Sequence, residues 1–243
     1  MKKMTFRLSL AAAMCAVGLF AAAPASAATY DFNAGGGGFS VTNFNDPFDG
    51  PWVYGAGSGV GGSGGWSTDG QGPELGRAPS TYLTSPAIPI TAAGAVTMSF
   101  DHRYSFEVDA WDGGAVFVSL NGGAFTKVPG ASFTANGYNG NVRPGSASEL
   151  QSTEGFIETS AGYGSGVFQT SSASLGSFAA GDSLQVRFTA AFDTNTTQGT
   201  PDWVIDNVIV NTPIPEPTSL LLLATAGAAI AVAVRRKRCH AAA

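Results

Sequence analysis

The stretch that decides the fold runs from Val96 to Val108 and reads VTMSFDHRYSFEV. Its even-numbered positions are apolar or aromatic apart from His102, whereas its odd-numbered positions are polar or charged. Strict alternation over this length predicts a β-strand with one face in the core and one face in solvent. Because His102 lies on the apolar face, we expect a buried histidine with hydrogen-bond partners rather than a catalytic one.

Shorter strands with turn signals between them surround this stretch. Asn121-Gly122 separates two apolar runs and favours a type I′ hairpin turn, because both central residues of that turn need a positive φ. Residues 184–192 alternate in the same way, short strands are expected at 154–159 and 167–170, and the last strand is expected at 203–210. We therefore expect an all-β fold, a single antiparallel β-sandwich of the jelly-roll kind.

One segment lacks any strand pattern. Residues 50–76 are dominated by Gly and Ser, so we predict a long Gly-rich surface loop. Trp52, Tyr54 and Trp66 lie in this loop, and we expect them to cover one end of the core. The alternative is that such aromatic rings form platforms for sugar rings. The candidate sugar-stacking residues are Trp52, Trp66 and Trp111.

The first 27 residues have the three parts of a secretory signal peptide. The basic part is Lys2 to Arg7, the apolar part is residues 8–23, and the small-residue part is Ala25-Ser26-Ala27. We predict an N-terminal signal helix and cleavage after Ala27, with Ala25 and Ala27 as the recognised residues, so that the mature chain begins near Ala28. An uncleaved signal anchor is the alternative.

The chain ends in a segment of three parts at residues 213–243. These parts are a proline-rich element with Pro215, Glu216 and Pro217, an uncharged apolar run at 218–234, and a basic cluster of Arg235, Arg236, Lys237 and Arg238. The prolines end the preceding fold, so the exported domain is expected at residues 28–212. As a helix the apolar run would span roughly 25 Å, and the cations would stay on the cytoplasmic side. We predict a C-terminal transmembrane helix; a buried core helix is the alternative.

This tail resembles the PEP-CTERM sorting signals of Gram-negative bacteria. The resemblance rests on the order of Pro215-Glu216-Pro217, apolar run and Arg-rich end, and Cys239 to Ala243 are a small extension beyond it. It implies that an exosortase-type enzyme removes the tail. It also implies that the protein is anchored in the inner membrane before processing and then passes to the cell surface or extracellular matrix, in contact with exopolysaccharide.

The exported domain is strongly acidic and has no cysteine. Residues 28–212 hold five Lys and Arg against sixteen Asp and Glu, a formal net charge of −11, and Cys15 and Cys239 lie outside this range. This charge disfavours nucleic acid and anionic lipid as partners and suits cations or neutral sugars. Without disulfides, stability must come from the core or from a bound metal.

Asp206 is the most unusual residue of the last predicted strand. In strict alternation it shares a face with Val204, Val208 and Val210, where an unpartnered carboxylate would be costly. We therefore expect either an ion pair with Arg103 or Arg187, or a calcium ion. Calcium takes about 6 to 8 oxygen ligands. The candidate metal ligands are Glu107, Asp109, Asp112 and Asp206, with Asp31 as a further candidate.

Residues 81–210 also resemble the MAM-like, jelly-roll β-sandwich modules of secreted bacterial proteins. Among the residues that carry this resemblance are Ser99-Phe100-Asp101-His102-Arg103-Tyr104, Trp111-Asp112-Gly113-Gly114 and Trp203-Val204-Ile205-Asp206-Asn207-Val208. The resemblance implies the fold and a structural calcium ion. It implies no particular activity, because such modules serve many host proteins.

Catalytic motifs are missing from the exported domain. It has one histidine and no thiol, and it lacks the patterns His-Glu-x-x-His and Gly-x-Ser-x-Gly as well as a phosphate-binding loop. No pair of carboxylates stands out for glycoside hydrolysis. We expect a non-catalytic surface or matrix protein, associated with exopolysaccharide or biofilm. The alternatives are a lectin-like carbohydrate-binding module and a secreted hydrolase.

Overall fold

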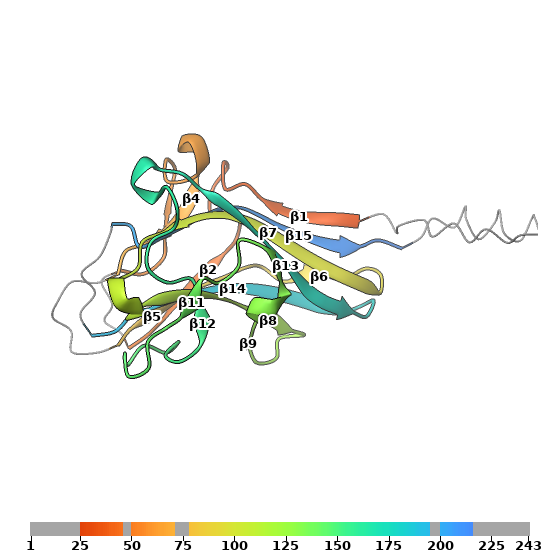
Figure 1. The fold of residues 1–243 in the computed structure, drawn as a ribbon. Coiled ribbons are helices and arrows are strands. Elements are labelled where there is room, and N and C mark those ends of the chain that lie inside the picture. The colour runs from red at the N-terminus through yellow and green to blue at the C-terminus, as the bar shows by residue number, and fades with distance from the viewer. Residues whose placement is uncertain (1–24, 46–49, 71–77, 195–199, 216–243) are drawn as a thin grey trace, which may run out of the picture.

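The protein folds as two antiparallel β-sheets packed face to face, which confirms the predicted all-β sandwich (Figure 1). The computed structural model describes residues 25–45, 50–70, 78–194 and 200–215. The predicted transmembrane run and basic cluster, and most of the predicted signal peptide, lie outside the described residues. Among the described residues, no helix is long and apolar enough to cross a membrane.

Sheet A has seven strands and is built around the pairing of β7 with β15. Its strand order is β10 (Phe133–Ala135), β13 (Gln169–Phe178), β7 (Gly94–Tyr104), β15 (Trp203–Pro213), β4 (Gly65–Thr68) and β3 (Val53–Gly55). The seventh strand, β1 (Ala25–Tyr30), pairs with the second half of β15, whereas β4 pairs with the first half. The first and last strands of the domain are therefore neighbours.

Sheet B covers the other side of the core with six strands. Its order is β2 (Ser40–Phe44), β5 (Ser80–Thr84), β14 (Ser183–Ala191), β8 (Gly113–Leu120) and β9 (Thr126–Lys127), with β6 (Ile88–Pro89) also paired to β14. A separate small ladder joins β11 (Gly140–Asn141) to β12 (Glu154–Gly155). The helical turns of the described part are η1 (Val60–Gly62), η2 (Val108–Ala110), η3 (Gly130–Ser132) and η4 (Tyr163–Ser165).

The long strand predicted at residues 96–108 is β7, and its alternation is confirmed. Its buried residues are Val96, Met98, Phe100, His102 and Tyr104. The strand ends at Tyr104 rather than at Val108, because the chain turns into η2, where Asp109 and Ala110 have φ values of 62° and 57°. The Asn121-Gly122 turn between β8 and β9 is also as predicted, with φ values of 53° and 71°.

Trp203 is the centre of the core. Its side chain is fully buried, and its ring lies against those of Trp52, His102 and Phe156. Gly114 allows this packing, since a Cβ at that position would lie 2.5 Å from Cζ3 of Trp203. The sandwich is thus filled by aromatic side chains from strands that are far apart in the sequence.

Two expectations about strands were wrong. Residues 50–76 are not one long surface loop: they contain β3, η1 and β4, and β4 is hydrogen-bonded to β15. The strands were hidden because they are only three and four residues long and lie among glycines. Of the strand expected at 167–170, only residues 169 and 170 are in a strand, and they are the first two of the ten-residue β13, whose Ser and Ala residues form no clear apolar pattern.

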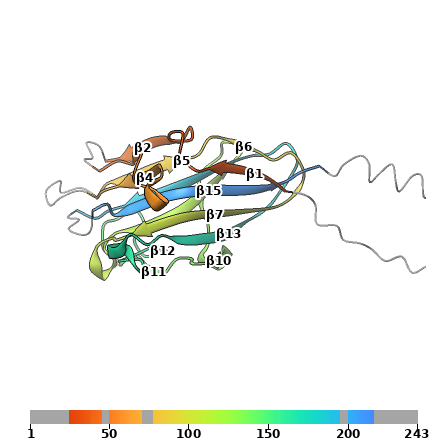
Figure 2. The same ribbon diagram turned by 90° about the horizontal axis from the view of Figure 1, so that it is seen from above.

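The start of β1 and the end of β15 lie at the same end of the sandwich. In β1 and β15 the partners of Ala25 and Ala27 are Pro213 and Asn211. Figures 1 and 2 show the start of β1 and the end of β15 on one side of the molecule, and the η1 and η4 turns toward the other. The molecule therefore has a terminus end and an opposite loop end. The predicted cleavage after Ala27 falls within β1 and stays a prediction.

Candidate functional site

A β-bulge in β15 sets the direction in which Asp206 points. The register against β7 shifts between Asp206 and Ile209, and Asn207 has a φ of 49°. The core-facing residues are Trp203 and Ile205 before the bulge and Val208 and Val210 after it. Asp206 therefore lies on the outer face of sheet A, and its predicted place beside Val208 and Val210 was wrong.

The expectation that Asp206 has partners is confirmed. The partners are backbone N–H groups and a serine hydroxyl, rather than Arg103, Arg187 or the other carboxylates predicted as metal ligands. Its Oδ2 accepts hydrogen bonds from the backbone N–H of Val60 at 2.9 Å and from Oγ of Ser63 at 2.7 Å, and its Oδ1 accepts one from the backbone N–H of Asn207 at 2.6 Å. Asp206 thus fixes the η1 turn onto the sheet. Hydrogen bonds to its charged form make the burial of this carboxylate tolerable.

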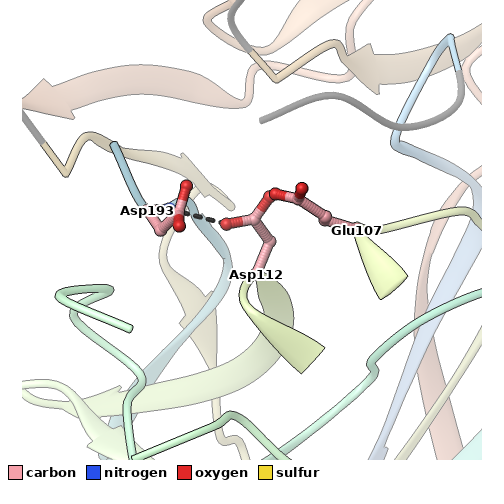
Figure 3. Close-up of side chains that lie close together, drawn as sticks. All are labelled: Glu107, Asp112 and Asp193. Carbon is pink, nitrogen blue, oxygen red and sulfur yellow. Dashed lines mark hydrogen bonds between the residues drawn. The ribbon is translucent and has the colours of Figure 1, made fainter. Parts of the chain in front are cut away.

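Three carboxylates meet at the loop end of the sandwich. Figure 3 shows Glu107, Asp112 and Asp193 pointing toward one another, and one oxygen from each lies within 4.8 Å of the other two. The backbone N–H of Asp193 donates to Oδ1 of Asp112 at 2.6 Å. Oxygens that share one calcium ion at about 2.3–2.6 Å lie within about 5 Å of each other, so this spacing fits calcium.

Asp202 adds a fourth, more deeply buried carboxylate close to this acidic cluster. Its side chain is 1% exposed, and its Oδ1 has no hydrogen-bond partner among the described residues, while Oδ2 accepts from the backbone N–H of Gly70. Burial, together with the negative charges of Asp69, Asp112 and Glu107, raises the pKa of Asp202 to about 8. A cation at this position would relieve the repulsion among these groups.

Of the four predicted metal ligands, the structure brings together Glu107 and Asp112. Asp206 is bound to the η1 turn, and the three carboxylates that converge do not include Asp109 or Asp31. Asp193 was missed because it lies 81 residues from Asp112 in the sequence. It is brought there by the pairing of β14 with β8, in which Ala191 lies opposite Gly113.

The tryptophans predicted as sugar platforms take structural roles. Trp52 and Trp66 are 3% and 8% exposed, so neither offers a ring face to solvent, and the expectation that they cover the core is confirmed. Their indole N–H groups donate to backbone oxygens of Thr81 and Gly36. Trp111 is partly exposed, but the guanidinium of Arg143 lies 4.3 Å from its ring centre.

A polar groove of about 620 Å³ lies on the outer face of sheet A toward the loop end. Its walls come from the η1 turn and from the segment after η4, both visible on the upper side of sheet A in Figure 1. The residues that line it include Gly57, Ser58, Ser67, Asp69, Arg103 and Phe168. Sequence reasoning missed this groove, because its parts come from segments that no motif connects.

Arg103 is the cation of the groove. Its guanidinium carbon lies 5.1 Å from the ring centre of Tyr163 and 5.5 Å from that of Phe168. Its Nε is buried and has no hydrogen-bond partner within the described residues. The predicted ion pair with Asp206 is absent from the described part, and Arg187 likewise binds elsewhere, 3.5 Å from the ring centre of Phe125 and hydrogen-bonded to Thr84.

The fold and these sites define an all-β sandwich with its polar features at the loop end. Residues 213–238 match the family model of the PEP-CTERM protein-sorting motif, as predicted from the tail. This motif implies an exported protein that is anchored in the membrane and then processed by an exosortase. The match begins at Pro213, the last residue of β15.

Several solved structures are similar to the chain at low identity, whereas no curated protein sequence matches it. The K1 cleaved adhesin domain of Lys-gingipain from Porphyromonas gingivalis has 15% identity and a TM-score of 0.44, with 77% of this chain and 98% of that chain covered. A family 35 carbohydrate-binding module from Paenibacillus barcinonensis has 19% identity and a TM-score of 0.34, with coverages of 75% and 97%.

Proposed function

We propose that the protein is a non-catalytic component of the cell surface or extracellular matrix of a Gram-negative bacterium, where it associates with exopolysaccharide in a biofilm. The observation that carries this proposal is the PEP-CTERM motif, which begins where the sandwich ends. The single histidine of the exported domain supports a non-catalytic role, because His102 is fully buried in the core and hydrogen-bonded there.

The position of the chain ends supports an orientation for the anchored form. Only four residues lie between Pro213 and Thr218, where the predicted transmembrane run begins, so the Cα atoms of these two residues are at most about 18 Å apart. The terminus end of the sandwich then faces the membrane, and the groove and acidic cluster face away from it. This arrangement leaves both sites accessible before and after processing.

The test is the intact mass and location of the protein, compared with a Glu216→Ala variant. We expect the parent to lose its tail and to appear outside the cell with exopolysaccharide, and the variant to keep its tail and stay in the inner membrane. Asp31→Asn, which also removes one acid but in the exported domain, should be processed like the parent. Equal masses and locations for parent and Glu216→Ala would contradict the proposal.

We also propose that the acidic cluster binds calcium, with Glu107, Asp112 and Asp193 as ligands. Two independent features support this: the mutual approach of their oxygens within 4.8 Å, and the buried Asp202 oxygen that has no hydrogen-bond partner in the described part of the chain. Bound calcium would neutralise charge at the loop end. It would thereby hold η2, the start of β8 and the end of β14 together.

A second candidate function is carbohydrate binding, the lectin-like alternative. The groove beside Arg103 favours it, because it offers donors, an acceptor and an aromatic side chain at the loop end. The aromatic platforms first expected for such a role do not support it, since Trp52 and Trp66 are buried. Binding of the full chain to a glycan array tests this function.

A further inference from the structure

The groove on sheet A has the size and the lining of a ligand site. Its volume of about 620 Å³ lies within the range of about 300–1,000 Å³ that is usual for small-molecule sites. Strands β4, β7 and β15 supply its floor with Ser67, Arg103 and Val204, so the floor is held by the hydrogen bonds of the sheet. Asp206 in turn holds the η1 wall through Val60 and Ser63.

The donor in this floor is preorganised. Two aromatic rings, those of Tyr163 and Phe168, lie next to the guanidinium of Arg103 and restrict its orientation. No carboxylate forms an ion pair with Arg103 among the described residues, and its Nε makes no hydrogen bond there. Because Nε is buried, the terminal Nη groups of this planar guanidinium are the ones that can donate hydrogen bonds to neighbouring oxygens of a ligand.

The groove also contains an acceptor, Asp69, and many small residues. Burial raises the pKa of Asp69. Its carboxyl oxygens line the groove and can accept hydrogen bonds from hydroxyl groups of a ligand. Gly57, Gly59 and Gly62 let a ligand approach the backbone of the η1 wall. Few apolar side chains line the groove, which disfavours a peptide that needs hydrophobic pockets.

The charge of the whole domain selects among polar ligands. Residues 28–212 carry a formal net charge of −11, which repels a polyanion such as a uronic acid polymer. An uncharged chain of sugar rings has adjacent hydroxyl oxygens for Arg103, hydroxyl donors for Asp69, and C–H faces for Phe168.

We propose that this groove binds a neutral oligosaccharide, with Arg103 as the residue that determines affinity by donating to adjacent sugar hydroxyls. This inference rests on the second candidate function, carbohydrate binding, and adds the place and the ligand class.

The test measures binding of the full chain, purified in detergent, to neutral glucan, galactan and mannan oligosaccharides and to oligouronates. The variants are Arg103→Gln, which removes the donor fork, and Gly57→Trp, which fills the groove. A Cβ at Gly57 meets no heavy atom within 4 Å, so the second variant should fold even if the first does not. The matched control is Arg143→Gln, since Arg143 also lies over an aromatic ring but outside the groove.

We expect a neutral oligosaccharide to bind with an affinity that changes little between about 0.05 and 0.5 M salt. Arg103→Gln and Gly57→Trp should each weaken it by roughly tenfold or more, and Arg143→Gln should not. Tighter binding to oligouronates would overturn the ligand class. Unchanged binding in both groove variants would overturn the place while leaving carbohydrate binding intact, and a parent that binds no glycan would overturn carbohydrate binding itself.

Discussion

The indole N–H of Trp203 donates a hydrogen bond to Nδ1 of His102 across 3.1 Å, and both side chains are fully buried. Since Nδ1 is the acceptor, the neutral ring carries its proton on Nε2, which lies 2.8 Å from Oγ of Ser171. That hydroxyl donates onward to the backbone oxygen of Asn136 at 2.5 Å. The core histidine is therefore a neutral link in a chain of hydrogen bonds between β15, β7 and β13.

This chain makes stability depend on pH in a defined direction. Burial lowers the pKa of His102 to about 3, whereas an unfolded chain takes up this proton near the ordinary value of 6.5. The contribution of neutral His102 is therefore complete above pH 6.5 and is lost as the pH falls toward 3, with a slope of up to about 1.4 kcal/mol per pH unit. Carboxylates titrate as well, so a matched variant is needed to isolate this effect.

The variant His102→Leu should isolate the contribution of His102 to this pH dependence of stability. At pH 7.5 we expect a loss of about 2–4 kcal/mol, because the indole N–H of Trp203 and the hydroxyl of Ser171 each lose a buried partner. Urea unfolding from pH 7.5 to pH 4 should show the parent and the variant converging as the pH falls. A difference that stays constant over this range would show that His102 is not held neutral.

Sequence patterns predicted some structural features of this protein and not others. Alternation in residues 96–108 predicted β7 and the sandwich, and Asn121-Gly122 predicted the hairpin, because these patterns follow from local backbone geometry. The bulge at Asp206 and Asn207 left no such pattern: one shifted residue reverses the faces of a strand without changing its composition.

The candidate sites were harder to predict for a related reason. Glu107 and Asp112 are close in the sequence, and both were predicted as ligands. Asp193 and Arg103 acquire their roles only through strand pairing, which joins β14 to β8 and places Arg103 opposite Val204. The sorting motif was predicted from the sequence alone, because its signal consists of consecutive residues.

The bond network of Asp206 predicts a graded effect on the η1 turn. Asp206→Ala leaves the backbone N–H of Val60 and the hydroxyl of Ser63 without their acceptor, and we expect a loss of about 2–4 kcal/mol in the free energy of unfolding. Ser63→Ala removes one of these bonds and should cost about 1 kcal/mol. Chemical denaturation measures both, and equal losses would contradict the role given to Val60.

The contact between Gly114 and Trp203 predicts an overpacking effect. A Cβ at Gly114 would lie 2.5, 2.7 and 2.9 Å from three atoms of the Trp203 ring, so Gly114→Ala should destabilise the sandwich by about 1–3 kcal/mol. Gly164→Ala is the control, because a Cβ there meets no heavy atom within 4 Å. Thermal unfolding and the near-UV circular dichroism of the tryptophans should change only in the first variant.

The acidic cluster predicts a response to chelation. If calcium binds Glu107, Asp112 and Asp193, removing it takes away a divalent charge that these three close carboxylates share. We expect a chelator to lower the melting temperature and added calcium to restore it, with a gain of about 2.7 kcal/mol at a hundredfold excess over the dissociation constant.

Variants of single carboxylates then separate calcium from an effect of ionic strength. Asp112→Asn and Asp193→Asn should abolish the response to calcium, because each removes a ligand charge from the cluster. Asp109→Asn should respond like the parent, since Asp109 is near in sequence but is not one of the three converging carboxylates, and asparagine tolerates its φ of 62°. Melting temperatures that are the same with chelator and with calcium would show that the cluster needs no metal, and a lost response in Asp109→Asn would place the ion elsewhere.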